Sequence, residues 1–287
     1  MRSRSRAGAP SPSRLGGLLL HLALLVAAGV SLLPFAWLIC AAFKRPEDLF
    51  SSVLLPWGHL DQLTLGNFIT LFGTRAFGTW LLNSIFLASA QTVLVVTLSS
   101  LGGFALAKYR FRFRRLIIAL MLATVLLPAQ VLLPSLDELM ERMGLVNTYA
   151  AVLAPNAISV LGMFLFWQAM RAVPDELLQA GRVDGCSEWR LWWSVALPMV
   201  RPMVGAFTLL SFLGAWNSFL WPQIVLQDEN KYPLPLGLAN LMGLQEYQSH
   251  YGLLMAATLL SVLPVVILFF ALQKDFIAGL SSGAVKG

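Results

Sequence analysis

The chain has 287 residues, of which 57% are hydrophobic and 12% are charged. A soluble domain of this length carries about twice that share of charged residues, so the composition excludes an ordinary soluble enzyme. The net charge is +6, but the basic residues flank apolar runs, which indicates contact with lipid headgroups and no nucleic-acid partner. The two cysteines, Cys40 and Cys186, are too few and too far apart for a disulfide framework.

Six apolar runs are each long enough to cross a bilayer, which takes about 20 residues. Backbone amides must be paired within each segment inside the hydrocarbon, so these runs are expected to be helices. The predicted fold is an all-α, polytopic membrane protein with six transmembrane helices over residues 15–273. Residues 1–14 are expected to be a mobile cytoplasmic tail, and residues 274–287 a cytoplasmic C-terminal tail. The predicted spans are Leu15–Phe43, Thr79–Ala107, Leu116–Leu136, Tyr149–Met170, Met199–Gln223 and Leu253–Gln273.

The distribution of Lys and Arg predicts the orientation. Fifteen of them lie in the two tails, in the connection between the second and third spans, and in the connection between the fourth and fifth. Five lie on the opposite side. Because cytoplasmic segments are enriched in Lys and Arg, both termini and the fourth–fifth connection are expected in the cytoplasm.

The second span carries polar residues on one face. Ser84, Ala88, Gln91 and Val95 recur at helical spacing. Polar side chains inside a membrane mark either a solute path or hydrogen bonds between helices, so Ser84 and Gln91 are candidates for the path, with helix contact as the alternative. The small residues at 99, 100, 102 and 103 predict a close approach of another helix.

The connection over residues 174–198 is charged and amphipathic. Pro174 and the acidic residues that follow it, including Glu176, suit a helix start. Gly185 is expected to break that helix, and Ser187 to cap a second one. Two short helices joined at a glycine predict a rigid cytoplasmic helix-turn-helix that a soluble partner can bind. The alternative is an ordinary amphipathic helix on the membrane surface.

The fifth span pairs an aromatic ring with an amide at Trp216 and Asn217. An amide and a flat ring suit a sugar, which presents hydroxyl groups and C–H faces. Both residues are therefore candidates for the solute path, again with helix–helix bonding as the alternative.

The loop resembles the cytoplasmic loop of permease subunits in binding-protein-dependent ATP-binding-cassette importers. The family motif reads Glu-Ala-Ala, three residues, Gly, nine residues, Ile, one residue, Leu-Pro. Here Gln179-Ala180-Gly181, Gly185, Val195 and Leu197-Pro198 keep every spacing. Gln179 replaces the acidic residue and Gly181 the second alanine, so an ion pair that the family makes there is not expected here. The loop and the C-terminal tail are most similar to the carbohydrate branch, in particular to the smaller permease of maltose-type heterodimers.

The resemblance implies a set of partners and a location. The partners are a second, homologous permease, two ATP-binding ATPase subunits and an extracytoplasmic solute-binding protein, in the cell membrane of a prokaryote. The implied solute is a sugar, a polyol or a glycerophosphate-type compound. The implied ATPase-docking residues are Glu176, Gln179, Ala180, Gly181, Asp184, Gly185, Leu197 and Pro198.

No chemistry of its own is expected from this chain. It contains no phosphate-binding G-x-x-x-x-G-K-[ST] loop and none of the common hydrolase or zinc motifs, so no cofactor, no metal and no enzymatic activity are predicted. The alternative function is a secondary transporter or channel that needs no ATPase. The predicted spans lack a central acidic residue to carry protons or sodium, which disfavours this alternative.

Overall fold

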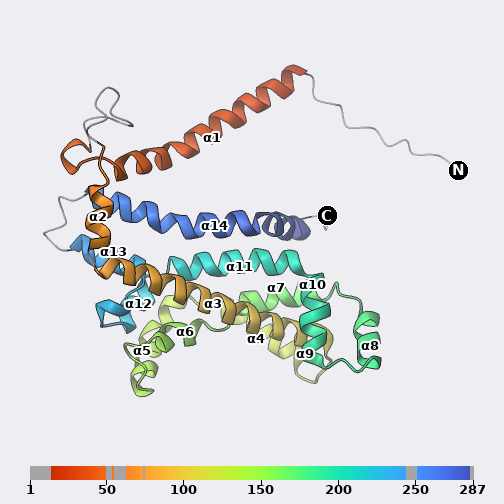
Figure 1. Cartoon of the computed structure of the whole chain (residues 1–287). Helices are drawn as coiled ribbons and strands as arrows, with labels where there is room; N and C mark the ends of the chain where they lie inside the picture. Colours follow the sequence, from red (N-terminus) through yellow and green to blue (C-terminus); the bar gives the residue numbers. More distant parts are fainter. Residues whose placement is uncertain (1–13, 50–53, 55–62, 74, 244–250, 285–287) are drawn as a thin grey trace. The chain divides into compact units, whose positions relative to one another are not determined.

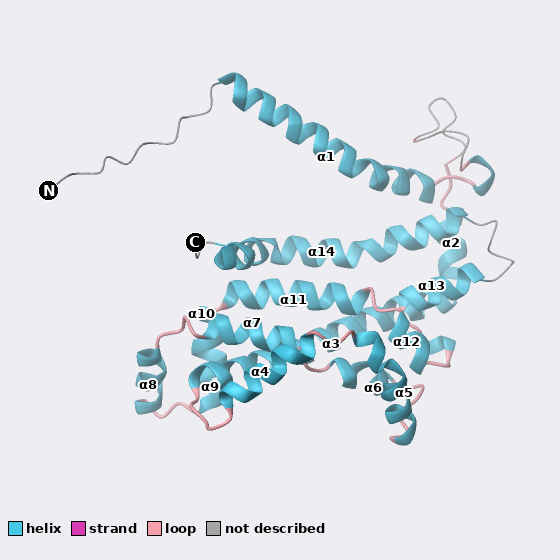
Figure 2. Cartoon of the chain, turned by 180° about the vertical axis from the view of Figure 1, so that it is seen from behind, coloured by secondary structure: helices cyan, strands magenta, loops and turns pink. Residues whose placement is uncertain are grey.

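The computed structural model describes residues 14–49, 54, 63–73, 75–243 and 251–284, and within this part the chain is helical, with one isolated antiparallel bridge between Lys44 and Leu63 (Figure 2). The predicted N-terminal tail, apart from residue 14, lies outside the described residues. The chain forms two compact units, residues 1–69 with 249–259, and residues 70–248 with 260–287.

The first unit contains α1 (Arg14–Ala42), η1 (Pro46–Asp48), the beginning of α2 (Gly66–Gly73) and the beginning of α14 (Tyr251–Ala284). The end of α1 is held by Asn67, whose side-chain nitrogen donates to the carbonyl oxygens of Ala42 at 2.9 Å and Lys44 at 2.8 Å. This bond pair satisfies carbonyl groups that a helix end leaves open.

The second unit contains the remaining helices and the second half of α14. Its long central helix is α3, and the others in chain order are α4 (Arg114–Val125), η3 (Ala129–Leu132), α5 (Leu133–Arg142), α6 (Tyr149–Leu153), η4 (Ala154–Asn156), α7 (Val160–Met170), α8 (Asp175–Val183), α9 (Glu188–Leu191), the π-helix η5 (Trp192–Ala196), α10 (Leu197–Met199), α11 (Arg201–Trp216), α12 (Leu220–Val225), η6 (Glu229–Lys231) and α13 (Leu234–Gly243). Helix α3 covers Arg75–Lys108.

Within the described residues, three long helices, α1, α3 and α14, are uninterrupted candidates for membrane spans, and up to six spans result if each of three bent helix pairs counts as one. The third predicted span was wrong as a continuous helix, because α4 ends at Val125 and the chain turns by 91° before α5. Pro128 lies in this break and cannot donate a helical hydrogen bond. The fourth predicted span is bent by 46° between Asn156 and Val160.

The fifth and sixth predicted spans also differ from the structure. Helix α11 ends at Trp216, and three non-helical residues separate it from α12, so the predicted single helix to Gln223 was wrong. The residues predicted as a C-terminal tail continue the last helix as far as Ala284, and Pro264 lies inside it without ending it.

Helix α3 packs closely against α7 because glycines on α3 leave room for larger residues of α7. A Cβ atom at Gly103 would lie 2.5 Å from the Phe166 Cβ and 2.7 Å from the Trp167 backbone nitrogen. A Cβ at Gly162 would lie 2.2 Å from the Phe207 ring of α11. The close approach predicted for the small residues of the second span is therefore confirmed.

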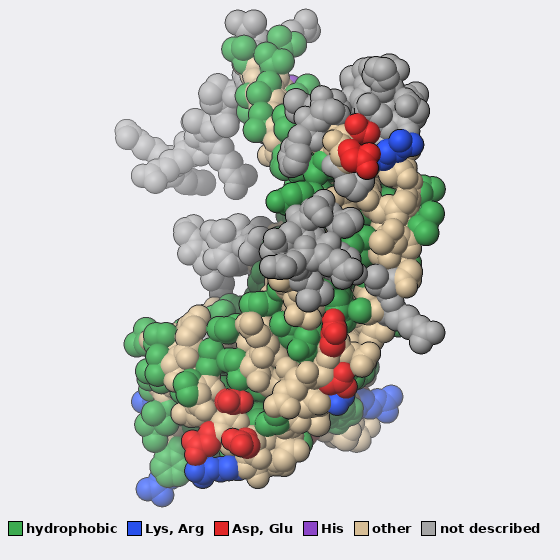
Figure 3. Space-filling model, turned by 90° about the vertical axis from the view of Figure 1, so that its left-hand side faces the viewer, with side chains coloured by type: hydrophobic (Ala, Val, Ile, Leu, Met, Phe, Trp, Pro, Cys, Tyr) green, Lys and Arg blue, Asp and Glu red, His purple; other side chains and the backbone are tan. Residues whose placement is uncertain are grey.

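Among the described residues, two apolar clusters pack opposite ends of the second unit (Figure 1). One joins α3, α7 and α11 to the helices α8–α10, and its buried members include Phe166, Leu191 and Trp192. The other joins α3 to α5, α6 and α12 through residues such as Leu87 and Trp221. The end with α5 and α12 carries acidic and basic side chains on its surface (Figure 3), including the ion pair between Glu138 and Arg142.

Candidate functional site

The loop over residues 174–198 forms two short helical arms. Helix α8 begins directly after Pro174, and the reversal occurs at Gly185, whose φ of +77° favours a residue without a Cβ atom. The Ser187 hydroxyl accepts from the Arg190 amide at 3.3 Å and caps α9. The predicted helix-turn-helix, with its glycine turn and serine cap, is confirmed as local structure.

The second arm consists of three consecutive helical segments. It continues from α9 through the π-helix Trp192–Ala196 into α10, and then turns by 89° into α11. The second arm therefore lies nearly at right angles to α11, the apolar helix that follows it. Pro198 and Pro202 flank this corner, and each lacks the amide that would continue a helix from the preceding turn.

The inner side of the loop is anchored in the core of the second unit. Leu178 of the first arm and Leu191, Trp192 and Ala196 of the second are at most 1% exposed. Gly181 belongs to this contact, because a Cβ there would lie 2.5 Å from the Leu191 Cδ2. The glycine that replaces the family's alanine thus makes room for leucine in the second arm.

The outer side of the loop is exposed and partly apolar. Val183 is 88% exposed, and Leu177, Trp189 and Trp193 are also exposed. Of the predicted docking residues, Gly181 and Leu197 are half-buried, and the rest are exposed, namely Glu176, Gln179, Ala180, Asp184, Gly185 and Pro198. Exposed apolar side chains beside a rigid turn form a surface suited to a protein partner.

The two arms are joined by a bidentate ion pair that sequence reasoning missed. Arg182 Nε and Nη2 donate to the two carboxylate oxygens of Glu188 at 2.7 and 3.1 Å. The Tyr109 hydroxyl donates to the same carboxylate, and the Arg182 guanidinium lies 6.0 Å from the Tyr109 ring centre. These bonds hold the pKa of Glu188 below its ordinary value, with Arg182 as the main cause. Burial, followed by the bond to Glu188, raises the pKa of the Tyr109 hydroxyl.

A second ionic contact ties the first arm to the end of α3. Lys108 Nζ lies 2.7 Å from Asp175 Oδ1 and also donates to the Val173 carbonyl oxygen. The Lys108 side chain is 5% exposed, whereas that of Asp175 is 70% exposed. The hydrogen bond from Lys108 lowers the pKa of Asp175. The reversal at Gly185 brings Arg182 to Glu188, and the packing of α3 brings Lys108 to Asp175. Neither ion pair could be predicted from residue spacing in the sequence.

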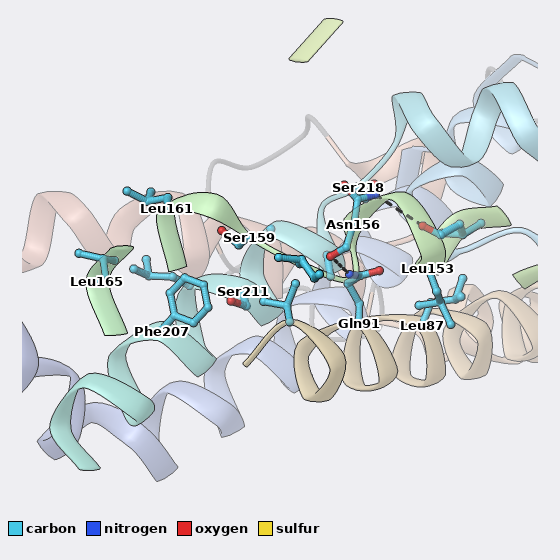
Figure 4. A pocket seen from close by; sticks show the side chains of 16 residues that line it. Leu87, Gln91, Leu153, Asn156, Ser159, Leu161, Leu165, Phe207, Ser211 and Ser218 are labelled. Carbon is cyan, nitrogen blue, oxygen red and sulfur yellow. Dashed lines mark hydrogen bonds between the residues drawn. The ribbon is translucent and has the colours of Figure 1, made fainter. Parts of the chain in front are cut away.

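A cavity of about 450 Å³ lies between α3, the bend after α6, and α11 (Figure 4). Its described lining contains no charged side chain. Apolar residues alternate in it with amide and hydroxyl groups, and these polar residues are Gln91, Asn156, Ser159, Ser211 and Ser218. The Gln91 side-chain nitrogen donates to the Asn156 carbonyl oxygen at the bend. No group of three or more possible metal ligands occurs among the described residues.

The four predicted solute-path residues lie in different surroundings. Gln91 lines the cavity. The Ser84 hydroxyl is buried and accepts from the Leu234 amide at 2.6 Å, at the start of α13. Trp216 is buried and stacks on Phe212, with ring centres 5.6 Å apart. Asn217 is exposed at the end of α11, where its side-chain nitrogen donates to the Leu213 carbonyl oxygen at 2.8 Å.

A helical membrane domain with a rigid two-armed loop at one end and an uncharged polar cavity between its helices defines a membrane transport component. The chain belongs to the family described as "Binding-protein-dependent transport system inner membrane component", which matches residues 96–281.

Curated relatives agree with this assignment over nearly the whole chain. The arabinooligosaccharides transport system permease protein AraQ of Halalkalibacterium halodurans is 37% identical, over 91% of this chain and 93% of that protein. The lactose transport system permease protein LacG of Rhizobium radiobacter is 30% identical, over 95% and 97%. The sn-glycerol-3-phosphate transport system permease protein UgpE of Pectobacterium atrosepticum is 30% identical, over 91% and 94%.

A solved structure shares the fold. One chain of a bacterial ABC transporter involved in the import of the acidic polysaccharide alginate superposes with a TM-score of 0.81, at 22% identity, over 93% of this chain and 100% of that one. The predicted all-helical, polytopic permease fold is therefore confirmed.

Family membership confirms the predicted class of function. The chain is a multi-pass inner-membrane permease of an ATP-driven, binding-protein-dependent importer, and it works with a solute-binding protein, a partner permease and ATPase subunits. ATP hydrolysis belongs to those separate subunits, so the permease itself is not an enzyme. The alternative of a transporter without an ATPase is wrong.

Proposed function

We propose that the loop over residues 174–198 is the site where an ATPase subunit docks. The observation that carries the proposal is its two-sided construction: Leu178 and Leu191 anchor the inner side, while Val183 and Trp189 are exposed on the outer side. A rigid, anchored projection can pass a movement of a bound partner to the helices. The contact residues are Glu176, Gln179, Ala180, Gly181, Asp184, Gly185, Leu197 and Pro198.

The docking proposal is tested by co-purification of the ATPase with permease variants. Gly185→Asp places a side chain on a residue with φ +77°, and Ala180→Trp adds bulk to the exposed surface of α8. Both are expected to release the ATPase and abolish uptake, whereas Gln179→Glu is tolerated. Gly144→Asp is the matched control, because Gly144 has φ +67° and an equally open position outside the loop. Normal ATPase retention by both loop variants argues against docking at this site.

We infer that the docking end of the second unit is cytoplasmic, together with both termini. The end of α14 supports this for the C-terminus, because Asp275 Oδ2 lies 3.4 Å from Arg201 Nε, three residues after Pro198. The distribution of Lys and Arg supports it for both termini.

The orientation is tested by thiol labelling in intact cells after Cys40 and Cys186 are replaced. Val183→Cys and Ser11→Cys are expected to be shielded from an impermeant reagent. Gln227→Cys, an exposed position next to η6, is expected to react. Labelling of Val183→Cys from outside would overturn this orientation.

We propose that the solute is an uncharged oligosaccharide and that it passes through the cavity. The described lining supports this, because its amide and hydroxyl groups pair with sugar hydroxyls, and none of the described lining residues carries a charge that would bind a phosphate or a carboxylate. Two relatives named for sugars, arabinooligosaccharides and lactose, favour the same class over sn-glycerol 3-phosphate.

We place Gln91 in the solute path, and keep Asn217, with Trp216 behind it, as a second candidate contact, because Asn217 is exposed. Ser84 is a weaker candidate, since its hydroxyl is buried and bonded to Leu234.

The solute class is tested by measuring ATPase stimulation of the complete importer with the cognate binding protein and a panel of solutes. Stimulation by oligosaccharides and not by glycerol 3-phosphate is expected, and the reverse pattern would refute the proposed class.

A further inference from the structure

We propose that α3 is the helix that transmits movement of the docking loop to the cavity and to the opposite end of the permease. The inference rests on the proposed docking function and adds the route by which the signal travels. Helix α3 has 34 residues and is about 51 Å long, so it spans the length of the second unit (Figure 1). Residues of α3, together with Tyr109 directly after it, bond to other segments at three levels.

The first level is the docking loop. Lys108, the last residue of α3, donates to the Val173 carbonyl oxygen and pairs with Asp175 at the start of α8. Tyr109 follows it and donates to Glu188 at the start of α9. Because the Lys108 side chain is 5% exposed, its charge depends on these partners, and the end of α3 cannot separate from the loop without leaving that charge unpaired. Both arms of the loop are thus bonded to the end of one helix.

The second level is the bend beside the cavity. The Gln91 side chain donates to the Asn156 carbonyl oxygen. The Ser99 hydroxyl donates to the Ser159 carbonyl oxygen and accepts from the Ser159 amide, both at 3.2 Å. These are backbone groups on either side of the 46° bend before α7. A shift of α3 along its axis therefore moves the anchor points of the cavity wall.

The third level is the opposite end, around η6. The Trp80 indole nitrogen donates to the Glu229 carbonyl oxygen at 2.9 Å. The Asn83 side-chain nitrogen donates to the carbonyl oxygens of Asn230 at 2.8 Å and Tyr232 at 3.0 Å. The connection between α12 and α13 is thereby fixed to the first turns of α3. An event that displaces this connection is communicated to α3, and through Lys108 and Tyr109 to the docking loop.

Rigidity makes α3 a better route than the covalent path through α11. The chain between the second arm and α11 contains a π-helix and an 89° corner, which can absorb a displacement by local bending. Helix α3 is continuous over its 34 residues and contains no proline. Its three sets of bonds join it to the docking loop, to the bend beside the cavity and to η6, so a displacement of any of these parts acts on the same continuous helix.

The test uses the complete reconstituted importer, with partner permease, ATPase subunits and binding protein. Lys108→Met and Tyr109→Phe remove the bonds to the loop and leave the outer docking surface unchanged. We expect uptake and binding-protein stimulation of the ATPase to fall about tenfold or more, with ATPase co-purification unchanged. Arg142→Met is the control, because its pair with Glu138 is exposed and lies outside these contacts.

A reversible tether supplies the second measurement. In a background without Cys40 and Cys186, Lys108→Cys with Asp175→Cys is expected to be uncoupled. A short bis-methanethiosulfonate, which joins the two cysteines through disulfide bonds and releases methanesulfinate, should restore stimulation, and a reductant that cleaves these disulfides should remove it again. If Lys108→Met does not reach the membrane, Tyr109→Phe and the tethered pair decide the question.

Two results would overturn the inference. The first is normal ATPase stimulation in both Lys108→Met and Tyr109→Phe. The second is loss of ATPase co-purification with the same variants, because it would mean that the contacts only shape the docking surface. Failure of the docking proposal is distinguishable, because it appears as ATPase retention in Gly185→Asp and does not depend on Lys108.

Discussion

Arg182 and Glu188 face each other across the turn at Gly185 and form a two-bond ion pair, with N–O distances of 2.7 and 3.1 Å. One residue belongs to the end of the first arm and the other to the start of the second. The pair therefore fixes the angle between the arms, while Tyr109 connects it to the end of α3. The geometry of the proposed docking surface depends on this contact.

Removing the pair should weaken docking without unfolding the protein. The two side chains are 38% and 48% exposed, so the coupling free energy of the ion pair is about 0.2–1 kcal/mol. Loss of the pair should therefore weaken the affinity of the permease for the ATPase by up to about fivefold. A double-mutant cycle with Arg182→Met and Glu188→Gln, read by ATPase binding to the reconstituted permease, should show this coupling. The same cycle at Arg142 and Glu138 should leave ATPase affinity unchanged. Additive effects in the loop cycle would mean that the pair does not set the docking geometry.

The close packing of α7 against α11 predicts a sharp difference between two glycines. Gly162→Ala should lower thermal stability by about 1–3 kcal/mol, because its Cβ would lie 2.2 Å from the Phe207 ring. Gly78→Ala in α3 has open space around its Cβ and should stabilise the helix by about 1 kcal/mol. Melting curves of the two purified variants in one detergent measure the contrast. Equal melting temperatures would contradict the described packing.

The cavity makes Gln91 the candidate with the clearest access to solute. Gln91→Ala should reduce uptake about tenfold, because a solute hydroxyl would lose a buried partner worth about 1–3 kcal/mol. Asn217→Ala tests the second candidate in the same uptake assay. Ser84→Ala is the structural comparison: it should lower thermal stability through the lost bond to Leu234, with a smaller effect on uptake. If Asn217→Ala impairs uptake and Gln91→Ala does not, the path runs along the end of α11 instead.

The ionic contacts of the loop predict its response to pH. The pKa values of Asp175 and Glu188 are lowered from 3.8 and 4.5. These two carboxylates therefore stabilise the folded loop fully above their ordinary pKa values, and this stabilisation is lost as the pH falls through the lowered pKa values. The pKa of Tyr109 is raised from 10.0, so its contribution is complete below pH 10.0 and is lost as the pH rises through the raised value. Hydrogen exchange of residues 175–191, corrected for intrinsic rates, should show constant protection between pH 5 and 9. A marked fall in protection between pH 7 and 5 would contradict this assignment.

Apolar runs located the membrane helices well, because span length and hydropathy are local properties. Helix α3 was predicted within a few residues of its observed ends, and the buried face with Gln91 and Val95 was correct. The break after Asn156 was missed, because a run of apolar residues does not reveal where helical hydrogen bonding stops. At this break, Ser159 caps α7, and Ser99 and Gln91 from α3 bond to the open backbone groups.

Short-range sequence patterns were enough to predict the class of protein, the turn at Gly185, the cap at Ser187 and the spacing of the loop motif, since each depends on residues close together in the chain. Helix packing was needed to show which side of the loop is buried, that Lys108 and Tyr109 bond to it, and that Gln91 lines the cavity while Ser84 does not. Those contacts join residues 65 to 150 positions apart. They arise when helices pack, because two side chains far apart in the chain meet only after the packing of whole helices has placed them.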